Sequence, residues 1–207
     1  MSKVTIQGNA SGTGTFTIAS PNSDTDHTLT LPNEAGTVLT SASDIPSSQI
    51  TGSLGITMAD MWRQIIDVTG DLDPIRGNFE QVDTHGFANI GSDMAVDSNG
   101  NWTFPETGLY HISANTRFQH QGSDYSSILI KTTTDNSTYA TAGRADSGTT
   151  SGIAFTHAQA NFIFNVTSTS THKIRFTYLA ASQSNVLKAS TNSNETYFTF
   201  IRLGDSQ

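Results

Sequence analysis

The chain of 207 residues contains no cysteine, so a disulfide framework, a thiolate metal site and a thiol redox centre are excluded. It also has few charges. Lys, Arg, Asp and Glu make up 14% of the residues, against roughly 25% in an average globular protein. The formal net charge is -8 and the ten Lys and Arg residues are scattered, which argues against contact with a phosphate backbone. We therefore expect no nucleic-acid partner.

Long apolar runs are missing as well. No stretch of about 18 apolar residues occurs, and the polar start MSKVTIQGNA does not resemble a secretory signal peptide, so no membrane insertion is expected. Long helix-forming runs rich in Ala, Leu, Glu and Lys are also absent, whereas 31 Thr and 25 Ser keep the chain polar without charge. Thr together with Val, Ile, Phe and Tyr favours strands, which predicts an all-β fold.

The composition divides the chain into three parts. Residues 1–40 hold short alternating runs such as TFTI and TLTL between Gly, Ser and Asn turns, with too few large apolar residues for a core. The apolar faces of these runs are expected to attach the segment to identical copies or to a larger scaffold, through Phe16, Ile18, Leu29 and Leu31. Residues 41–60, rich in Ser and Gly, predict a linker or neck. Residues 61–207 predict a separate head domain.

The head is expected to begin with a brief helical turn that leads into its first strand. Thr57 and Asp60 could form a capping box, and the apolar residues that follow lie at helical spacing. A strand that begins near Met61 fits equally well, since Trp62 and Ile66 also alternate with polar neighbours.

The remainder of the head shows short strands at the spacing of an antiparallel sandwich or jelly roll. The expected strands are residues 79–82, 93–96, 102–104, 108–118, 126–133, 139–144, 153–166, 173–180 and 195–203. Asn99-Gly100 lies between two of them and is the strongest hairpin signal, because a type I′ turn needs positive φ at both central residues.

The last of these strands is apolar on both faces. Phe198 and Phe200 lie on one side, and Tyr197, Ile201 and Leu203 on the other. A surface strand alternates apolar with polar residues, because successive side chains point to opposite faces of the sheet. One face can enter a sandwich core, so the other is expected to meet another subunit.

Two motifs carry a resemblance. The run Phe104-Pro-Glu-Thr-Gly-Leu-Tyr-His-Ile112 and the final run Tyr197 to Gly204 resemble the complement globular-head and tumour-necrosis-factor-like jelly rolls, over about residues 61–204. The resemblance implies a homotrimeric jelly-roll head. Trimer contacts are then expected from Tyr110, Tyr197, Phe198 and Phe200, with the Phe198/Phe200 face toward the neighbours. The collagen-like stalk of the complement proteins is absent, so complement ligands and cytokine receptors are not carried over.

A second resemblance concerns the front of the chain. The segment Thr28-Leu-Thr-Leu-Pro-Asn-Glu-Ala-Gly-Thr-Val-Leu39 resembles one found near the front of many tailed-phage fibre and appendage proteins. It implies a virion protein that attaches to other virion proteins through residues 1–40 and presents its head to a host surface glycan or protein. A capsid decoration protein and an envelope-polysaccharide hydrolase are the alternatives. Recognition would fall on the polar loops 119–125, 134–138, 144–151 and 181–194.

Catalytic motifs are lacking. The chain has no Gly-x-Ser-x-Gly elbow, no His-Glu-x-x-His helix and no phosphate-binding Gly-rich loop with Lys. Glycoside hydrolases use paired carboxylates, but a charge cluster alone rarely marks a site. The candidate pairs are Asp71 with Asp73, Glu80 with Asp83, and Asp93 with Asp97. We interpret them as loop acids, and expect no enzyme activity and no cofactor.

A metal site is not expected either. Asp97 to Asn101 resembles the beginning of a calcium loop, but Gly108 stands where a bidentate acid is required, so a hairpin turn explains the segment better. The six histidines, at positions 27, 85, 111, 120, 157 and 172, form no ligand pair at close spacing. His111 and His157 lie on expected strands that could reach a subunit interface, where protonation near pH 6 could loosen assembly.

Overall fold

The computed structural model describes residues 55–150 and 152–207, together with 10–15, 17, 19, 22–26 and 28. The chain divides into two compact units, Met1–Ile45 and Pro46–Gln207. The attachment residues Phe16, Ile18, Leu29 and Leu31 lie outside the described residues, so their predicted role is untested. The strands and contacts that follow belong to the second unit.

All regular secondary structure in the described residues is β-strand, which confirms the all-β prediction. The strands are β1 Ala59–Gln64, β2 Val68–Thr69, β3 Phe79–Gln81, β4 Ala95–Val96, β5 Trp102–Thr103, β6 Gly108–His120, β7 Asp124–Thr133, β8 Ala140–Thr149, β9 Ala154–Val166, β10 Lys173–Ala180, β11 Val186–Leu187 and β12 Tyr197–Gly204. Within the same residues, none of the chain forms a helix long and apolar enough to span a bilayer.

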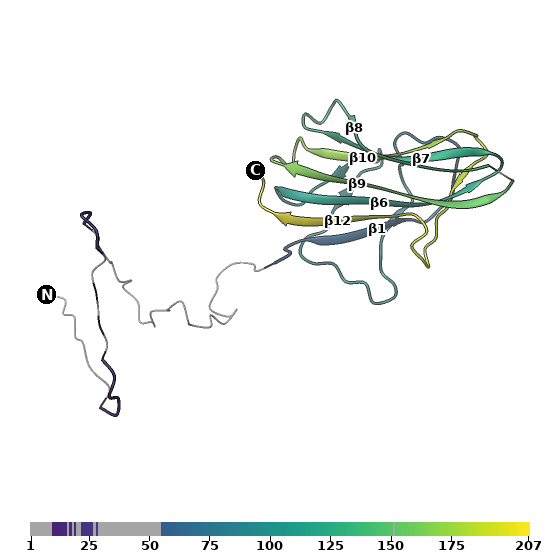
Figure 1. Ribbon diagram of the computed structural model, residues 1–207. Coiled ribbons are helices and arrows are strands. Elements are labelled where there is room, and N and C mark those ends of the chain that lie inside the picture. The colour runs from purple at the N-terminus through teal and green to yellow at the C-terminus, as the bar shows by residue number, and fades with distance from the viewer. Residues whose placement is uncertain are drawn as a thin grey trace. The chain divides into compact units, whose positions relative to one another are not determined.

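The strands form two antiparallel sheets that pack face to face (Figure 1). The larger sheet runs β9-β6-β12-β1-β3, and β11 and β2 continue it beside the C-terminal end of β6. The smaller sheet has the order β4-β5-β10-β7-β8. The predicted antiparallel sandwich is confirmed.

Most strand predictions match closely, and the misses are short. The strand predicted for residues 173–180 is β10, with the same bounds. The two-residue strands β2 and β11 escape prediction, because pairs of residues carry no periodicity. β11 lies in the segment 181–194, for which the sequence predicts an exposed loop, yet Leu187 is completely buried.

The start of the head corrects a prediction. No helical turn precedes the first strand, and β1 begins at Ala59, two residues before the expected domain boundary. Asp60 does not act in a capping box. Its buried carboxylate accepts hydrogen bonds from Trp62 Nε1 at 2.7 Å, Gln81 Nε2 at 2.9 Å and the backbone N–H of Met94 at 2.8 Å. The bonds from Gln81 and Met94 are long-range and tie the segment into the sheet, so tertiary contacts override the local helical pattern.

The hairpin prediction is confirmed, although its turn differs. β4 and β5 pair across the segment 97–101, and Asp97 N–H donates to Asn101 O at 3.0 Å. Only Gly100 has positive φ in this segment, 78°, so the turn is not type I′. The Asp97 carboxylate accepts hydrogen bonds from the backbone N–H groups of Asn99 and Asn101, each at 2.9 Å. The acid therefore organises the turn itself.

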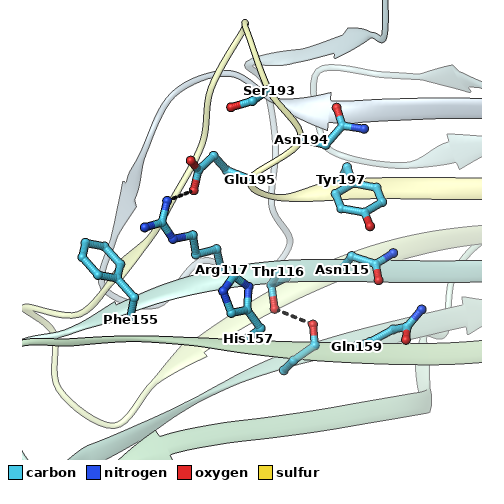
Figure 2. Close-up of a pocket in the computed structure, with 11 residues that line it drawn as sticks. Asn115, Thr116, Arg117, Phe155, His157, Gln159, Ser193, Asn194, Glu195 and Tyr197 are labelled. Atoms are coloured by element: carbon cyan, nitrogen blue, oxygen red, sulfur yellow. Dashed lines mark hydrogen bonds and ion pairs between the residues drawn. The ribbon is translucent and has the colours of Figure 1, made fainter. Parts of the chain in front are cut away.

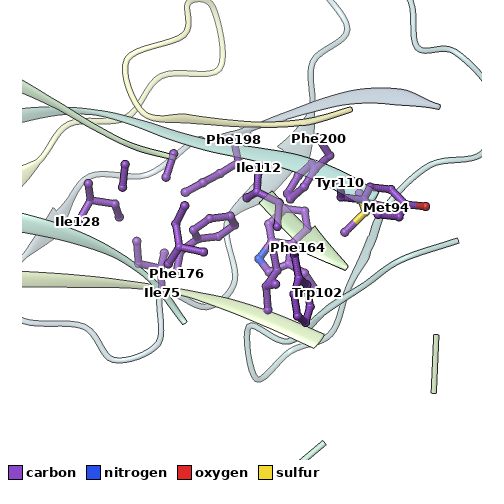
Figure 3. Packing of buried hydrophobic residues seen from close by; sticks show 14 of the residues in the cluster. Ile75, Met94, Trp102, Tyr110, Ile112, Ile128, Phe164, Phe176, Phe198 and Phe200 are labelled. Carbon is purple, nitrogen blue, oxygen red and sulfur yellow. The ribbon is translucent and has the colours of Figure 1, made fainter. Parts of the chain in front are cut away.

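The core is an aromatic cluster between the two sheets (Figure 3). Trp102, completely buried, is its centre. Its ring centroid lies 5.2 Å from that of Phe200, 5.8 Å from that of Phe176 and 6.0 Å from that of Phe198. Phe176 and Phe198 stack at 4.1 Å. These contacts fix the face of β12 that points inward, because Phe198 and Phe200 reach rings supplied by the opposite sheet.

Burial of these residues corrects the predicted trimer contacts. Tyr110, Phe198 and Phe200 are all 0% exposed in the single chain, so their side chains are not available to a neighbouring subunit. The expectation that the Phe198/Phe200 face meets the neighbours is therefore wrong. Tyr197 is half-buried on the opposite face and its predicted role in a trimer contact stays a prediction.

Candidate functional site

The candidate site is the outward face of the larger sheet, hereafter the outward face. It consists of the side chains that alternate with core residues along β1, β6, β9 and β12. On the three central strands these are Leu109, His111, Ser113, Asn115 and Arg117 of β6, Phe155, His157, Gln159, Asn161, Ile163 and Asn165 of β9, and Tyr197, Thr199 and Ile201 of β12.

The strand register gives this face two different halves. Ile201, His111 and Ile163 form one cross-strand row, beside Ala59 at the start of β1. Four residues along each strand, Tyr197, Asn115 and Gln159 form another row, beside Arg63. We call the first region the entry end, because the chain enters the sheet there, and the second the far end. The outward face thus changes from apolar to polar along the strands.

Apolar side chains gather at the entry end. Among the described residues, eight large hydrophobic side chains are exposed, and four of them lie here: Ile56, Ile90, Ile163 and Leu203, with exposed fractions of 43 to 56%. Ile90 pairs with Ala59 in an isolated bridge, and Leu203 sits at the register shift of β12. A local concentration of exposed apolar side chains marks an interaction surface more often than chance scatter does.

Arg202 holds the entry end together. Its guanidinium donates to Thr107 O at 2.9 Å, to Thr57 Oγ1 at 3.2 Å and to the Asp205 carboxylate at 2.7 Å. These bonds join the residues before β1, the turn before β6 and the C-terminal tail. The apolar side chains nearby are therefore presented from a fixed backbone.

The far end carries a groove of about 670 Å³ (Figure 2). Its floor is formed by β6 and β9, and one wall comes from the segment 193–195 that leads into β12. The lining side chains are almost all polar: Asn115, Thr116, Arg117, His157, Gln159, Ser193, Asn194, Glu195 and Tyr197, with Phe155 and Ala158.

Arg117 is the central side chain of the groove. Its Nη1 donates to Glu195 Oε2, and its guanidinium carbon lies 4.3 Å from the centroid of the Phe155 ring. Figure 2 shows the guanidinium between the carboxylate and the ring. An ion pair and a cation–π contact together hold a flexible side chain in one place and cancel its charge.

Two amides occupy the floor of the groove. Asn115 Nδ2 and Gln159 Nε2 both donate to Ser113 Oγ, at 2.9 and 3.0 Å. Within the described residues, the carbonyl oxygens of these two amides have no hydrogen-bond partner. They therefore remain available as acceptors next to the hydroxyl of Tyr197.

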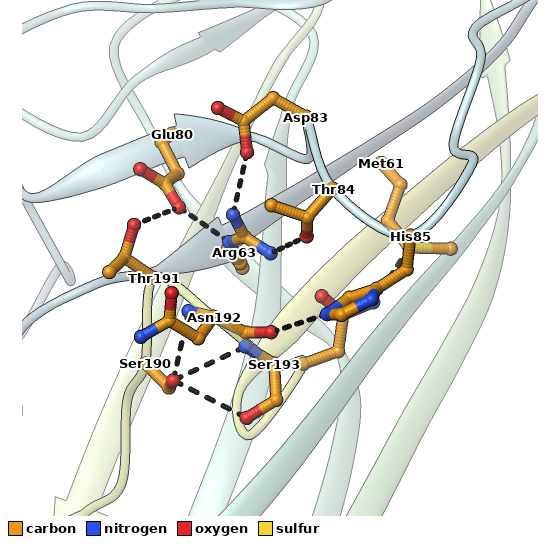
Figure 4. Close-up of polar contacts among 11 residues, drawn as sticks. Met61, Arg63, Glu80, Asp83, Thr84, His85, Ser190, Thr191, Asn192 and Ser193 are labelled. Carbon is orange, nitrogen blue, oxygen red and sulfur yellow. Dashed lines mark hydrogen bonds and ion pairs between the residues drawn. The ribbon is translucent and has the colours of Figure 1, made fainter.

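Two loops are fastened over the outward face at β1 (Figure 4). Arg63 is 1% exposed and donates to Glu80 Oε1 at 2.5 Å, Asp83 Oδ1 at 2.8 Å and Thr84 Oγ1 at 3.0 Å. Thr191 also donates to Glu80, at 2.8 Å. The buried cation thus fixes both the loop after β3 and the loop that forms the wall of the groove.

The acidic pairs considered for hydrolysis have structural roles. Arg63 binds both Glu80 and Asp83. Asp73 accepts from Thr177 Oγ1 at 2.7 Å and from Lys131 Nζ at 2.5 Å. Burial raises the pKa of the Asp73 carboxyl, but these bonds and the positive charge of Lys131 outweigh it and hold the pKa below its usual range. The same balance, with bonds from the turn amides, lowers the pKa of Asp97. Asp73 and Asp97 therefore lack the raised pKa of a general acid.

The described residues contain no group of three His, Cys, Asp or Glu side chains that could hold a metal ion. His111 and His157 lie on the outward face, as expected for strands that could reach an interface. His120 is completely buried, with Nδ1 2.8 Å from Asp124 Oδ1 and Nε2 2.8 Å from Thr156 Oγ1. It packs beside Phe118 on the core side of β6, as a structural group.

No protein-family model matches the chain, and no curated protein matches its sequence. Solved structures do. Murine APRIL at pH 5.0 is 12% identical with a TM-score of 0.54, over 70% of this chain and 98% of that one. Eiger TNF from S. frugiperda is 11% identical with a TM-score of 0.55, over 74% and 96%. Identity this low shows the fold alone. The head is a tumour-necrosis-factor-like jelly roll, which confirms that part of the resemblance.

Proposed function

We propose that the chain is a homotrimeric virion protein, a fibre, spike or appendage of a tailed phage. It attaches to the particle through residues 1–40 and presents its jelly-roll head for adhesion to the host surface. The phage assignment is supported by the resemblance of the segment Thr28 to Leu39 to phage fibre and appendage proteins. The trimer is supported by the jelly-roll fold and by the surface of the head.

The observation that carries the trimer is the apolar entry end. Ile163 is 56% exposed, and it lies in one row with His111 and the half-buried Ile201. Complete burial of an aliphatic side chain contributes about 1.5–3 kcal/mol, so each half-exposed residue here would add about 1 kcal/mol to association. Subunits that meet on this half also bring the starts of their β1 strands, at Ala59, toward one another. That geometry suits attachment to a single support.

Multivalency is the mechanism of the proposed adhesion. Three heads on one trimer, and several trimers on one particle, convert a second contact into an intramolecular event. Weak binding per head is therefore sufficient. The far ends of the heads point away from the entry of the chain and would face the host.

Two isoleucines of nearly equal exposure test the assembly. Ile163→Asp places a carboxylate in the proposed contact, where its desolvation costs several kcal/mol, and should give monomers in size-exclusion chromatography with light scattering. Ile66→Asp is the control, because Ile66 is 54% exposed and lies between β1 and β2, outside the row of Ile201, His111 and Ile163. Trimers that persist in the Ile163→Asp variant, or that dissociate equally in both variants, contradict the proposed contact.

Location on the particle tests the rest of the proposal. Gold-labelled antibody against the head should decorate the tail or its appendages in electron micrographs of the phage. Label spread over the capsid instead would favour the decoration protein.

A further inference from the structure

The far-end groove is not used by the proposed subunit contact. The apolar row at Ile163 lies at the entry end, whereas the groove begins at the row of Asn115 and Gln159, four residues along the same strands. Its open side faces away from the sandwich core. A polar hollow of about 670 Å³ on a rigid sheet is a suitable size for a small ligand.

The charges of the groove argue against an acidic ligand. Arg117 is the only Lys or Arg among the lining residues, and Glu195 already neutralises it. Phosphate and carboxylate ligands require unpaired cations, usually in a bidentate arrangement. The chain also carries a net charge of -8, which repels anions at longer range.

The hydrogen-bonding groups match a ligand that is rich in hydroxyls. The amides of Asn115, Gln159 and Asn194 each combine a donor and an acceptor, and the Tyr197 hydroxyl can act as either. A sugar hydroxyl likewise donates and accepts, so it can pair with every one of these groups. A peptide that added a strand at the centre of the floor would need free backbone groups, but β6 is paired on both sides, with β9 and β12.

An aromatic ring completes the arrangement. Phe155 is 50% exposed, and the guanidinium of Arg117 lies over one face of its ring, 4.3 Å from the centroid. The faces of a pyranose ring carry C–H groups that pack against an aromatic side chain. Phe155 supplies such a surface at one end of the row of polar groups.

From these observations we propose that the far-end groove binds a neutral saccharide, a pyranose unit of a host surface glycan. The groove floor of Asn115 and Gln159 pairs with its hydroxyls, the fixed Arg117–Glu195 pair orients it, and Phe155 packs against its C–H face. That the saccharide belongs to a host glycan rests on the proposed adhesive function. The ability of the groove to bind a neutral saccharide depends only on the residues of the head.

Saturation-transfer NMR on the full chain tests the groove directly. The neutral probes are methyl glucoside, methyl galactoside, methyl mannoside and N-acetylglucosamine, and the acidic probes are glucuronic acid and N-acetylneuraminic acid. We expect at least one neutral probe to receive saturation and neither acidic probe to do so. Gln159→Ala and Phe155→Ala should each weaken binding about fivefold or more, the usual effect of losing one such contact.

Asn161→Ala is the matched control. Asn161 is an exposed amide on the same face of β9, two residues from Gln159, and it is not part of the groove lining. Binding should be unchanged in this variant. The saccharide site would be overturned if none of the neutral probes bound or if only the acidic probes bound. It would also be overturned if Asn161→Ala weakened binding as much as Gln159→Ala does.

The molecular mass of each protein sample in solution, measured in parallel, tests the proposed trimer independently of saccharide binding. A trimer that binds no neutral probe overturns the groove and leaves the trimer standing. A monomer that binds a neutral probe, and whose Gln159→Ala variant binds it more weakly, supports the saccharide site and contradicts the proposed trimer. If Gln159→Ala weakens assembly while no probe binds, the groove is a contact between copies, and the saccharide proposal is wrong.

Discussion

Phe200 and Ile201 are adjacent on β12 and have opposite roles in this account. Phe200 is 0% exposed and its ring lies 5.2 Å from that of Trp102, whereas Ile201 is half-buried on the outward face. Replacing either residue by Ala removes side-chain atoms without adding charge. The pair therefore distinguishes a residue that stabilises the fold from one that stabilises the assembly.

The expected magnitudes differ accordingly. Truncation of a fully buried Phe costs about 3–5 kcal/mol, because it loses transfer free energy and leaves a cavity. For a domain of this size each kcal/mol lowers Tm by about 2–4 °C, so Phe200→Ala should lower it by about 6–20 °C. Ile201→Ala should lower the free energy of unfolding by about 1 kcal/mol at most. It should, however, weaken the association of the subunits about tenfold.

Near-ultraviolet circular dichroism on heating, at one fixed protein concentration, gives Tm, and dilution followed by light scattering gives the association. The order of the effects is decisive. If Ile201→Ala lowers Tm more than Phe200→Ala does, or if Phe200→Ala dissociates trimers whose fold is unchanged, the assignment of the two faces is wrong.

Three further measurements test the structure that positions the site. Gly100→Ala should destabilise the head by about 1–3 kcal/mol in urea unfolding, because φ is 78° and an added Cβ would lie 2.3 Å from Ile75 O; an unchanged midpoint would contradict this turn. Asp73→Asn should cost up to about 1 kcal/mol at pH 7, since half of this side chain is exposed. Because the folded state lowers the pKa of Asp73, the difference in free energy of unfolding between the variant and the wild type should disappear as the pH falls below about 4 and the wild-type carboxylate becomes protonated. A difference that is constant from pH 7 to pH 2 would exclude the ionised carboxylate as its cause. Burial raises the pKa values of Tyr110 and Tyr178 to about 12, so the ultraviolet titration of the folded chain should continue up to about pH 12, and the free energy of unfolding should fall as the pH rises from about 10 toward 12. A tyrosine titration that is complete near pH 10 in the folded chain would contradict the burial.

The sequence predicted the sandwich well, because long strands such as β6 and β10 have a clear period of two. It could not determine which face of β12 is internal. Phe198 and Phe200 on one side and Tyr197 and Ile201 on the other are all compatible with a core. Only the positions of Trp102 and Phe176, supplied by the second sheet, decide between them.

The groove could not be predicted from the sequence either. Arg117 and Glu195 are 78 positions apart, and they meet because β6 pairs with β12. Phe155 joins them through the pairing of β6 with β9. No local motif marks any of the three. A weaker signal does exist: the polar composition of the segment 181–194 predicts a recognition loop, and Ser193 and Asn194 form a wall of the groove.

The central claim is that the head associates through the apolar half of its outward face. Sedimentation velocity of the unmodified 207-residue chain across a dilution series tests it most directly. The account predicts one species of about 66 kDa, three times the 22.1 kDa of a single chain, which persists at micromolar concentration and is lost in Ile163→Asp. A single species of 22.1 kDa at every concentration would contradict it.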